Sequence, residues 1–206
     1  MNPEQVRAMD YLRRRGTDAP VADLRRQLRS AFRDVEALLA SVAPDERLLA
    51  PAAGKWSPQE ILDHLVVSHG PAIEHFRQLL AGISPEAVAI PAGLQSAAPL
   101  SLSWDLLVSD LAAIHGSFEE LVGAAPESLP LEPKAIVEMV VKAPATEGGE
   151  PRPVHWYERL DWKQFVQALR VHTLEHRAQL ERALSRRSAR APDSSPMIGA
   201  NTGDKK

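Results

Sequence analysis

Two of the seven histidines in this sequence have a spacing that suits metal binding. His172 and His176 are four residues apart within an apolar stripe, so on a helix of about 100° per residue both rings project from adjacent turns onto one side. At this spacing a helix offers two imidazole nitrogens to one metal ion. A buried polar ring without a partner costs about 1–3 kcal/mol, so two such rings need either an ion or hydrogen-bond partners.

His64 is the candidate for a third ligand. It follows Ile61 by three residues and precedes Leu65, which places it at the edge of the apolar stripe of another predicted helix. A nitrogen from a second helix would complete a set of three ligands and leave coordination positions open, as in catalytic and ligand-binding metal sites. The alternative is that all three rings are core histidines, hydrogen-bonded to the backbone or to neighbours such as Glu175 and Gln179.

The other four histidines receive separate predictions. His115 lies within the apolar stripe of a third helix, which favours a buried, hydrogen-bonded ring over one that lines a pocket or adds a metal ligand. His75 is eleven residues beyond His64, about 16 Å along a helix, so it cannot share the same ion. His69 lies off the apolar stripe and is expected on the surface, and His155 is expected at the mouth of a pocket.

Two carboxylates are candidates for orienting the rings. Glu60 lies one turn before His64, and Glu175 immediately precedes His176. Either carboxylate could accept a ring N–H and so fix the tautomer of a ligating histidine. The alternatives are a role for Glu60 in capping its helix and a solvent-exposed position for Glu175.

The composition excludes several other kinds of site. The chain has 206 residues, of which 44% are hydrophobic, a formal net charge of −3 and no cysteine. The lack of cysteine rules out a disulfide framework, a thiolate nucleophile, a sulfur-ligated zinc site and an iron–sulfur cluster. The mildly acidic balance argues against nucleic acid as a partner. No apolar run approaches the roughly 18 residues of a membrane span and the first residues lack a signal-peptide pattern, so we expect a cytoplasmic protein.

Four long amphipathic helices are expected to position the histidines. The second of these helices has clear start signals, namely Ser57 as the cap, Pro58 at the first helical position and Glu60 in a capping box. Pro71 interrupts this second helix and predicts a bend or local break near Gly70. Its apolar stripe is expected to run on to a buried Ile83. The apolar periodicity places the four helices over about 20–42, 57–83, 101–122 and 161–185.

Shorter segments lie at the two ends of the chain. Residues 3–15 are predicted to form an extra amphipathic helix that ends at Gly16, with three arginines in its last turn. Residues 188–206 are rich in Arg, Ser, Pro and Gly and are expected to form a disordered tail. The remaining residues, 1–187, are therefore expected to form one all-α domain, a four-helix bundle.

A long connection precedes the last helix. Residues 136–141 contain several β-branched side chains, residues 145–149 carry a turn signal, and residues 154–157 include two aromatic rings. A small β-hairpin and a loop with one helical turn fit this pattern equally well.

Two segments resemble the DinB/YfiT-like superfamily. Residues 54–65, GKWSPQEILDHL, are similar to its second-helix signature, in which a tryptophan and a capped helix start lead to a histidine. Residues 160–180 resemble its last-helix pattern of two histidines four apart before a Gln-Leu pair. The resemblance implies a four-helix bundle with a metal-binding histidine triad. By position, the triad maps onto His64, His172 and His176.

The resemblance also implies a type of activity. It covers roughly residues 21–185 and points to a metal-dependent enzyme, either a hydrolase or a transferase or isomerase that uses a low-molecular-weight thiol. We expect zinc or nickel as the ion, a small-molecule substrate, no nucleic-acid or membrane partner, and a fold that allows a homodimer. Any thiol must come from outside, because the chain has no cysteine. The alternatives are a non-enzymatic module that binds a small molecule and an oligomeric scaffold. The N-terminal stretch, Pro71 and residues 131–157 depart from the family pattern and leave the substrate open.

Overall fold

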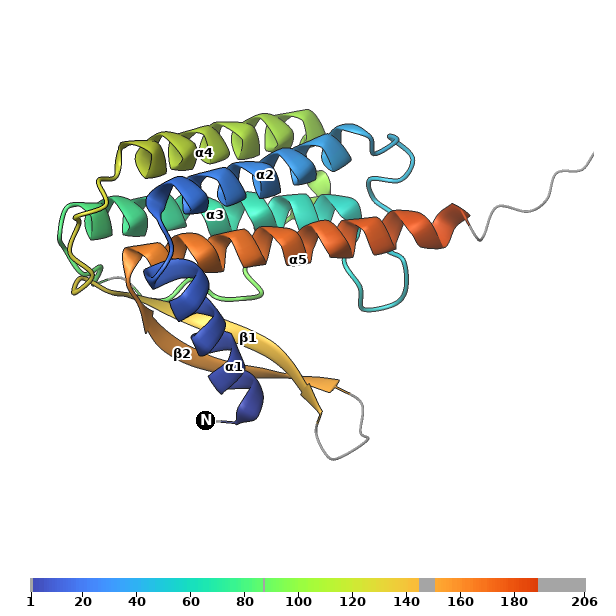
Figure 1. Ribbon diagram of the computed structural model, residues 1–206. Helices are drawn as coiled ribbons and strands as arrows, with labels where there is room; N and C mark the ends of the chain where they lie inside the picture. The colour runs from blue at the N-terminus through green and yellow to red at the C-terminus, as the bar shows by residue number, and fades with distance from the viewer. Residues whose placement is uncertain (1, 87, 145–150, 189–206) are drawn as a thin grey trace, which may run out of the picture.

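The four apolar stripes of the sequence form the four long helices of a bundle (Figure 1). They are α2 (Val21–Ala40), α3 (Pro58–Leu80), α4 (Trp104–Ala124) and α5 (Trp162–Ser188). The computed structural model describes residues 2–86, 88–144 and 151–188. Both α2 and α3 pack against α4 and α5, so α2 and α3 lie diagonally opposite each other. The predicted four-helix bundle is confirmed.

Side-chain caps fix where the two histidine-bearing helices begin. At the start of α3, the Glu60 N–H donates to the Ser57 hydroxyl and the Ser57 N–H donates to the Glu60 carboxylate, which confirms the predicted capping box. At the start of α5, Asp161 and Gln164 exchange the same pair of bonds, at 2.9 and 3.2 Å. Caps of this kind satisfy N–H groups that have no partner within the helix, so each sets the register in which its helix presents later side chains.

The expected break in α3 does not occur. The helix continues without interruption through Pro71, because the exposed ring of Pro71 lies on the outer face while Ala72 and Ile73 beside it are buried in the bundle. Tertiary packing therefore holds the helix where one backbone hydrogen bond is missing. The expected burial of Ile83 is also wrong. Gly82, with a φ of +79°, turns the chain away after α3, and Ile83 is 56% exposed.

The N-terminal helix does not end at Gly16. Helix α1 (Pro3–Leu12) continues into η1 (Arg13–Thr17), a turn of π-helix that includes this glycine. Gly16 is buried against the start of α5, where an added Cβ would lie 2.9 Å from the Cα of Gln164. The adjacent Thr17 hydroxyl donates to the Asp161 carboxylate at 2.6 Å. The glycine thus allows the close approach that attaches the N-terminal segment to α5.

The long connection is a β-hairpin. Strand β1 (Ala135–Pro144) pairs antiparallel with β2 (Pro151–Leu160), in a register that sets Met139 opposite Trp156. The hairpin and α1 lie on the same side of the bundle, next to α5 (Figure 1). The predicted turn at 145–149 lies outside the described residues. So does the predicted tail 188–206, apart from residue 188, which ends α5.

A polar layer divides the core of the bundle. One apolar cluster contains Phe32, Phe118 and Leu169, and a second contains Leu111 and Leu180. The histidines of α5 lie between Leu169 and Leu180, and therefore between the two clusters. All four helices contribute polar side chains at this level, namely Glu36, His64, His69, His115, His172 and His176. None of the helices in the described part of the chain combines the length and the apolar character needed to cross a membrane.

Candidate metal centre

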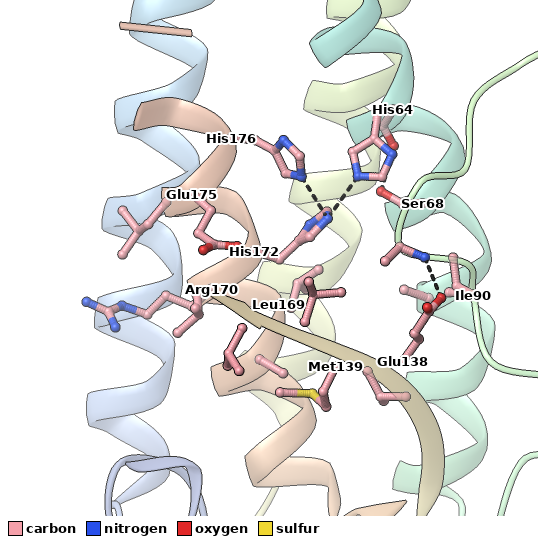
Figure 2. Close-up of a pocket in the computed structure, with 18 of the residues that line it drawn as sticks. His64, Ser68, Ile90, Glu138, Met139, Leu169, Arg170, His172, Glu175 and His176 are labelled. Carbon is pink, nitrogen blue, oxygen red and sulfur yellow. Dashed lines mark hydrogen bonds between the residues drawn. The ribbon is translucent and has the colours of Figure 1, made fainter. Parts of the chain in front are cut away.

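Three histidine side chains from two helices converge on one point (Figure 2). The Nε2 atom of His172 lies 3.0 Å from Nε2 of His64 and 3.1 Å from Nε2 of His176. Each of the three rings offers one ligand atom, and these atoms lie within 4.8 Å of one another. The spacing of four residues on α5 aligns two of the rings, and the packing of α3 against α5 supplies the third.

The Nδ1 atom of each ring faces a different partner. Nδ1 of His64 donates to the backbone carbonyl of Leu94 at 2.6 Å. Nδ1 of His176 lies 3.1 Å from Oε1 of Gln179, and Nδ1 of His172 lies 3.1 Å from Nε2 of His69. With Nδ1 occupied in this way, the three Nε2 atoms are the ones directed toward the shared point. Such outer partners orient a ring and select the tautomer in which it ligates a metal.

The two predicted carboxylate partners do not hold the rings. Glu60 accepts hydrogen bonds from the N–H and hydroxyl of Ser57 and thus serves the helix cap. Glu175 is exposed in the cavity wall. The carbonyl of Leu94 was not predicted as a partner, because a backbone oxygen in a loop leaves no signal in the residue pattern. The sequence predicts Gln179 as a partner only under the alternative that the three rings are hydrogen-bonded core histidines.

The other histidines lie partly where the sequence predicts. His115 is buried, as expected, and stacks on Phe32 with 3.7 Å between ring centroids. The expected surface position of His69 is wrong, since its side chain is buried and contacts both His115 and His172. Helix α3 is buried over several faces, so distance from one stripe does not imply exposure.

His75 and His155 line the neighbouring cavity without joining the triad. His75 is buried in the cavity wall, more than one helical turn beyond His69 on α3. His155 is exposed on β2, and its Nδ1 lies 2.8 Å from the Glu138 carboxylate. Among the described residues, the group of potential ligands that could share one ion consists of the triad alone.

Trp56 covers the triad from one side. Its ring centroid lies 5.0 Å from that of His64 and 6.1 Å from that of His176, stacked on the latter at 14°. This contact was not predicted from the sequence. It keeps part of the triad away from water, which makes charge on the rings costly.

The surroundings keep the imidazoles neutral. Burial lowers the pKa of His176 to about 3, with a further contribution from the nearby ring of His64. Burial also lowers the pKa of His64, against the opposing effect of the hydrogen bond to Leu94. The pKa of His172 is lowered well below its ordinary value, first by burial and then by the other two rings. Neutral rings keep the lone pairs that a metal ion requires.

The triad lies in the wall of a cavity of about 1070 Å³. Helices α3 and α5 form one side of the cavity, and β1, α1 and the loop at 90–93 form the other. The lining combines apolar residues with a few charged groups, including Glu138 and Arg170 (Figure 2). The Glu138 carboxylate accepts the Ala92 N–H at 2.7 Å, which joins the loop to the hairpin. The hairpin thus provides a wall that faces the histidines across open space.

Comparison with known proteins gives the family. The sequence profile that describes the DinB superfamily matches residues 27–193. The chain belongs to the DinB superfamily. The matched region begins within α2 and includes every residue of the triad and the hairpin. A search of curated proteins finds no match for this DinB-superfamily chain.

Solved structures share this DinB-superfamily fold at low sequence identity. YfiT from Bacillus subtilis, described as a probable metal-dependent hydrolase with an unusual four-helix bundle topology, is 12% identical and has a TM-score of 0.62 over 82% of this chain and 87% of its own. The four-helix bundle protein TT2238 is 15% identical, with a TM-score of 0.51 over 79% of this chain and 98% of its own. A mycothiol-dependent maleylpyruvate isomerase is 12% identical, with a TM-score of 0.57 over 80% of this chain and 62% of its own. At these identities the likeness establishes the fold.

The donor set of the triad suits a divalent metal ion. Three neutral imidazoles with converging Nε2 atoms form a set of borderline ligands typical of zinc, nickel and copper, whereas calcium and magnesium prefer oxygen. The Nδ1 contacts of the rings leave these Nε2 atoms available. The residues present therefore fit a metal of the kind that the fold family implies.

Proposed function

We propose that this protein is a metal-dependent enzyme that acts on a small molecule, with a zinc or nickel ion held by His64, His172 and His176. The observation that carries the proposal is the convergence of three Nε2 atoms in the wall of a cavity of about 1070 Å³. A structural zinc site is closed by four protein ligands, whereas a catalytic site has three and leaves room for water or substrate. A triad of histidines that faces an open cavity matches the arrangement of a catalytic site.

The residues of the chain orient the donors and shape the cavity. The Leu94 carbonyl and the Gln179 side chain hold two of the rings by Nδ1, and Trp56 covers them. A bound ion would supply Lewis acidity, lowering the pKa of a coordinated water or thiol and polarising a substrate. Glu138 and Arg170 are charged groups on the cavity wall that could orient a polar substrate.

The cavity is large enough to admit two small molecules together. Pockets for one ligand commonly measure about 300–1,000 Å³, and this cavity is about 1070 Å³. It therefore has room for a low-molecular-weight thiol beside a second substrate, and any such thiol must be external because the chain has no cysteine. The description of the isomerase of similar fold as mycothiol-dependent supports this thiol-dependent transfer or isomerisation. The description of YfiT supports hydrolysis as the second candidate.

Metal analysis of protein purified without a histidine tag tests the ligand set. We expect about one zinc or nickel ion per chain, and loss of that ion in His64→Ala and His172→Ala. His155→Ala is the matched control, because His155 lines the same cavity outside the triad. Retention of the ion by either triad variant, or its absence from the unaltered protein, would refute the proposed site.

Activity assays then separate the reaction types. The metal-loaded protein is tested on ester and amide panels, and on conjugation of low-molecular-weight thiols to electrophiles, each with and without a chelator. Chelator-sensitive turnover that requires a thiol supports transfer or isomerisation, and turnover without a thiol supports hydrolysis. Metal binding without turnover in any panel would instead indicate the binding module, and absence of both would indicate the scaffold. A homodimer, a cytoplasmic location and the absence of a nucleic-acid partner stay predictions from the sequence.

A further inference from the structure

A chain of three hydrogen bonds leads from the triad across the bundle to a carboxylate. Nδ1 of His172 lies 3.1 Å from Nε2 of His69, and Nδ1 of His69 lies 3.3 Å from Nε2 of His115. Nδ1 of His115 then lies 2.6 Å from Oε1 of Glu36. The four residues come from α5, α3, α4 and α2 respectively, so every helix of the bundle contributes one member.

The carboxylate at the end gives this chain a direction. An ionised carboxylate only accepts hydrogen bonds, so His115 donates from Nδ1, and a neutral His115 ring then presents a lone pair on Nε2. His69 then donates from Nδ1, and as a neutral ring it accepts at Nε2 the hydrogen bond that His172 donates from Nδ1. A neutral His172 in this tautomer has a lone pair on Nε2, the atom that faces His64 and His176.

Packing and burial keep the rings in this arrangement. The ring of His115 stacks on Phe32 with an interplanar angle of 3°, and His69 and His115 are each 1% exposed. Burial lowers the pKa of His115, which favours a single proton on that ring, and the two nitrogens of His69 each face a nitrogen of another imidazole. A single proton per ring and fixed ring planes make the direction of one bond dictate that of the next.

We propose that Glu36, His115 and His69 are positioning residues that hold His172 in its metal-ligating tautomer. We call these three residues the relay. Glu36 lies at its outer end, with its side chain 35% exposed, and His115 and His69 transmit the tautomer preference through the core to His172. This inference rests on the metal site proposed above. It assigns a function to two buried histidines and a carboxylate that the triad itself leaves unexplained.

Metal affinity in two variants and their combination tests the relay. Glu36→Gln replaces a pure acceptor with an amide that can donate or accept, so the direction is lost while the shape stays nearly the same. Loss of outer-shell partners typically weakens metal binding about 10–100-fold. We expect the Kd for zinc to rise about tenfold in Glu36→Gln and up to about 100-fold in His69→Phe, which removes the acceptor for His172.

The double variant separates a relay from two independent effects. If Glu36 acts through His69, the combined variant binds zinc no more weakly than His69→Phe alone, whereas independent effects would multiply. Asp23→Asn is the matched control, because it removes one carboxylate from the same helix at a surface ion pair with Arg26. Multiplying effects, or equal zinc affinity in Glu36→Gln and the control, would overturn the relay.

Tautomers measured without metal keep the two proposals distinguishable. Long-range ¹H–¹⁵N spectra of the metal-free protein should show His69, His115 and His172 protonated on Nδ1, and Glu36→Gln should weaken this preference in all three. Protonation of His172 on Nε2 in the unaltered protein would overturn the relay even if zinc binds. Absence of zinc binding with the expected tautomers would instead refute the proposed metal site. This readout also stands if His69→Phe fails to fold.

Discussion

The metal-free protein should lose stability steeply as the pH falls from 7 to 5. The pKa of His176 is about 3 in the folded protein, whereas an unfolded histidine has a pKa of about 6.5. Below pH 6.5 the unfolded chain therefore binds a proton at this residue that the folded chain refuses, so unfolding is favoured as the pH falls. The contribution of His176 to stability is fully present above the unfolded pKa of about 6.5. It is lost as the pH falls toward the folded pKa of about 3.

The size of this loss follows from the two pKa values. Each pH unit of differential protonation corresponds to about 1.36 kcal/mol, and integration from pH 7 to pH 5 gives about 2 kcal/mol for one ring that stays neutral throughout. His69 and His172, whose pKa values are also lowered well below the ordinary value by burial, shift stability in the same direction. Because a domain has only about 5–15 kcal/mol of total stability, the effect is large.

Urea denaturation at the two pH values, with a chelator present, measures the loss. His176→Gln removes one titrating ring, so its difference in unfolding free energy between pH 7 and pH 5 should be about 2 kcal/mol smaller than that of the unaltered protein. Any constant cost of the substitution cancels in this difference. Thr173→Val is the control, because Thr173 is buried in the same part of α5 and does not titrate. An equal pH dependence in His176→Gln and the unaltered protein would refute the assignment of a buried neutral ring.

Three further predictions concern the packing of the bundle and the tryptophan that covers the triad. Gly16→Ala would place a Cβ 2.9 Å from the Cα of Gln164, so we expect a loss of about 1–3 kcal/mol in stability by urea denaturation, and an unchanged midpoint would contradict the close approach. Phe32 is 1% exposed and stacks on His115. Phe32→Ala should therefore cost about 3–5 kcal/mol, with a much smaller cost arguing against a packed core at this ring. Trp56 lies within 6.1 Å of two triad rings, so nickel binding should quench tryptophan fluorescence, and Trp56→Phe should remove most of that quenching.

The polar layer explains why these effects concentrate around one level of the bundle. Six titratable side chains meet between two apolar clusters, where burial penalises any unpaired polar atom. Ring-to-ring hydrogen bonds compensate part of this cost, since His69 contacts both His115 and His172. A bundle filled at this level with apolar side chains would have no such cost. The proposed metal site and its relay give a functional reason for the polar layer.

Local features of the site could be predicted from the sequence alone. The four apolar stripes, the capping box at Ser57 and the spacing of His172 and His176 depend on residues within a few positions of one another. Helix geometry converts such spacings directly into directions in space. The choice of His64 as the third member needed both its place beside an apolar stripe and the family resemblance.

Tertiary packing decided most partners of those rings, whereas Gln179 lies only three residues from His176 on the same helix. His69 was predicted on the surface, but α3 contacts α4 and α5 and also lines the cavity, so a residue off one stripe is still buried. Glu36 lies 79 positions from His115, and Leu94 lies 30 positions from His64. No local periodicity connects positions so far apart, and a carbonyl oxygen has no residue type to mark it. The hairpin that lines the cavity is likewise brought beside α5 by the path of the chain, which places β2 directly before that helix.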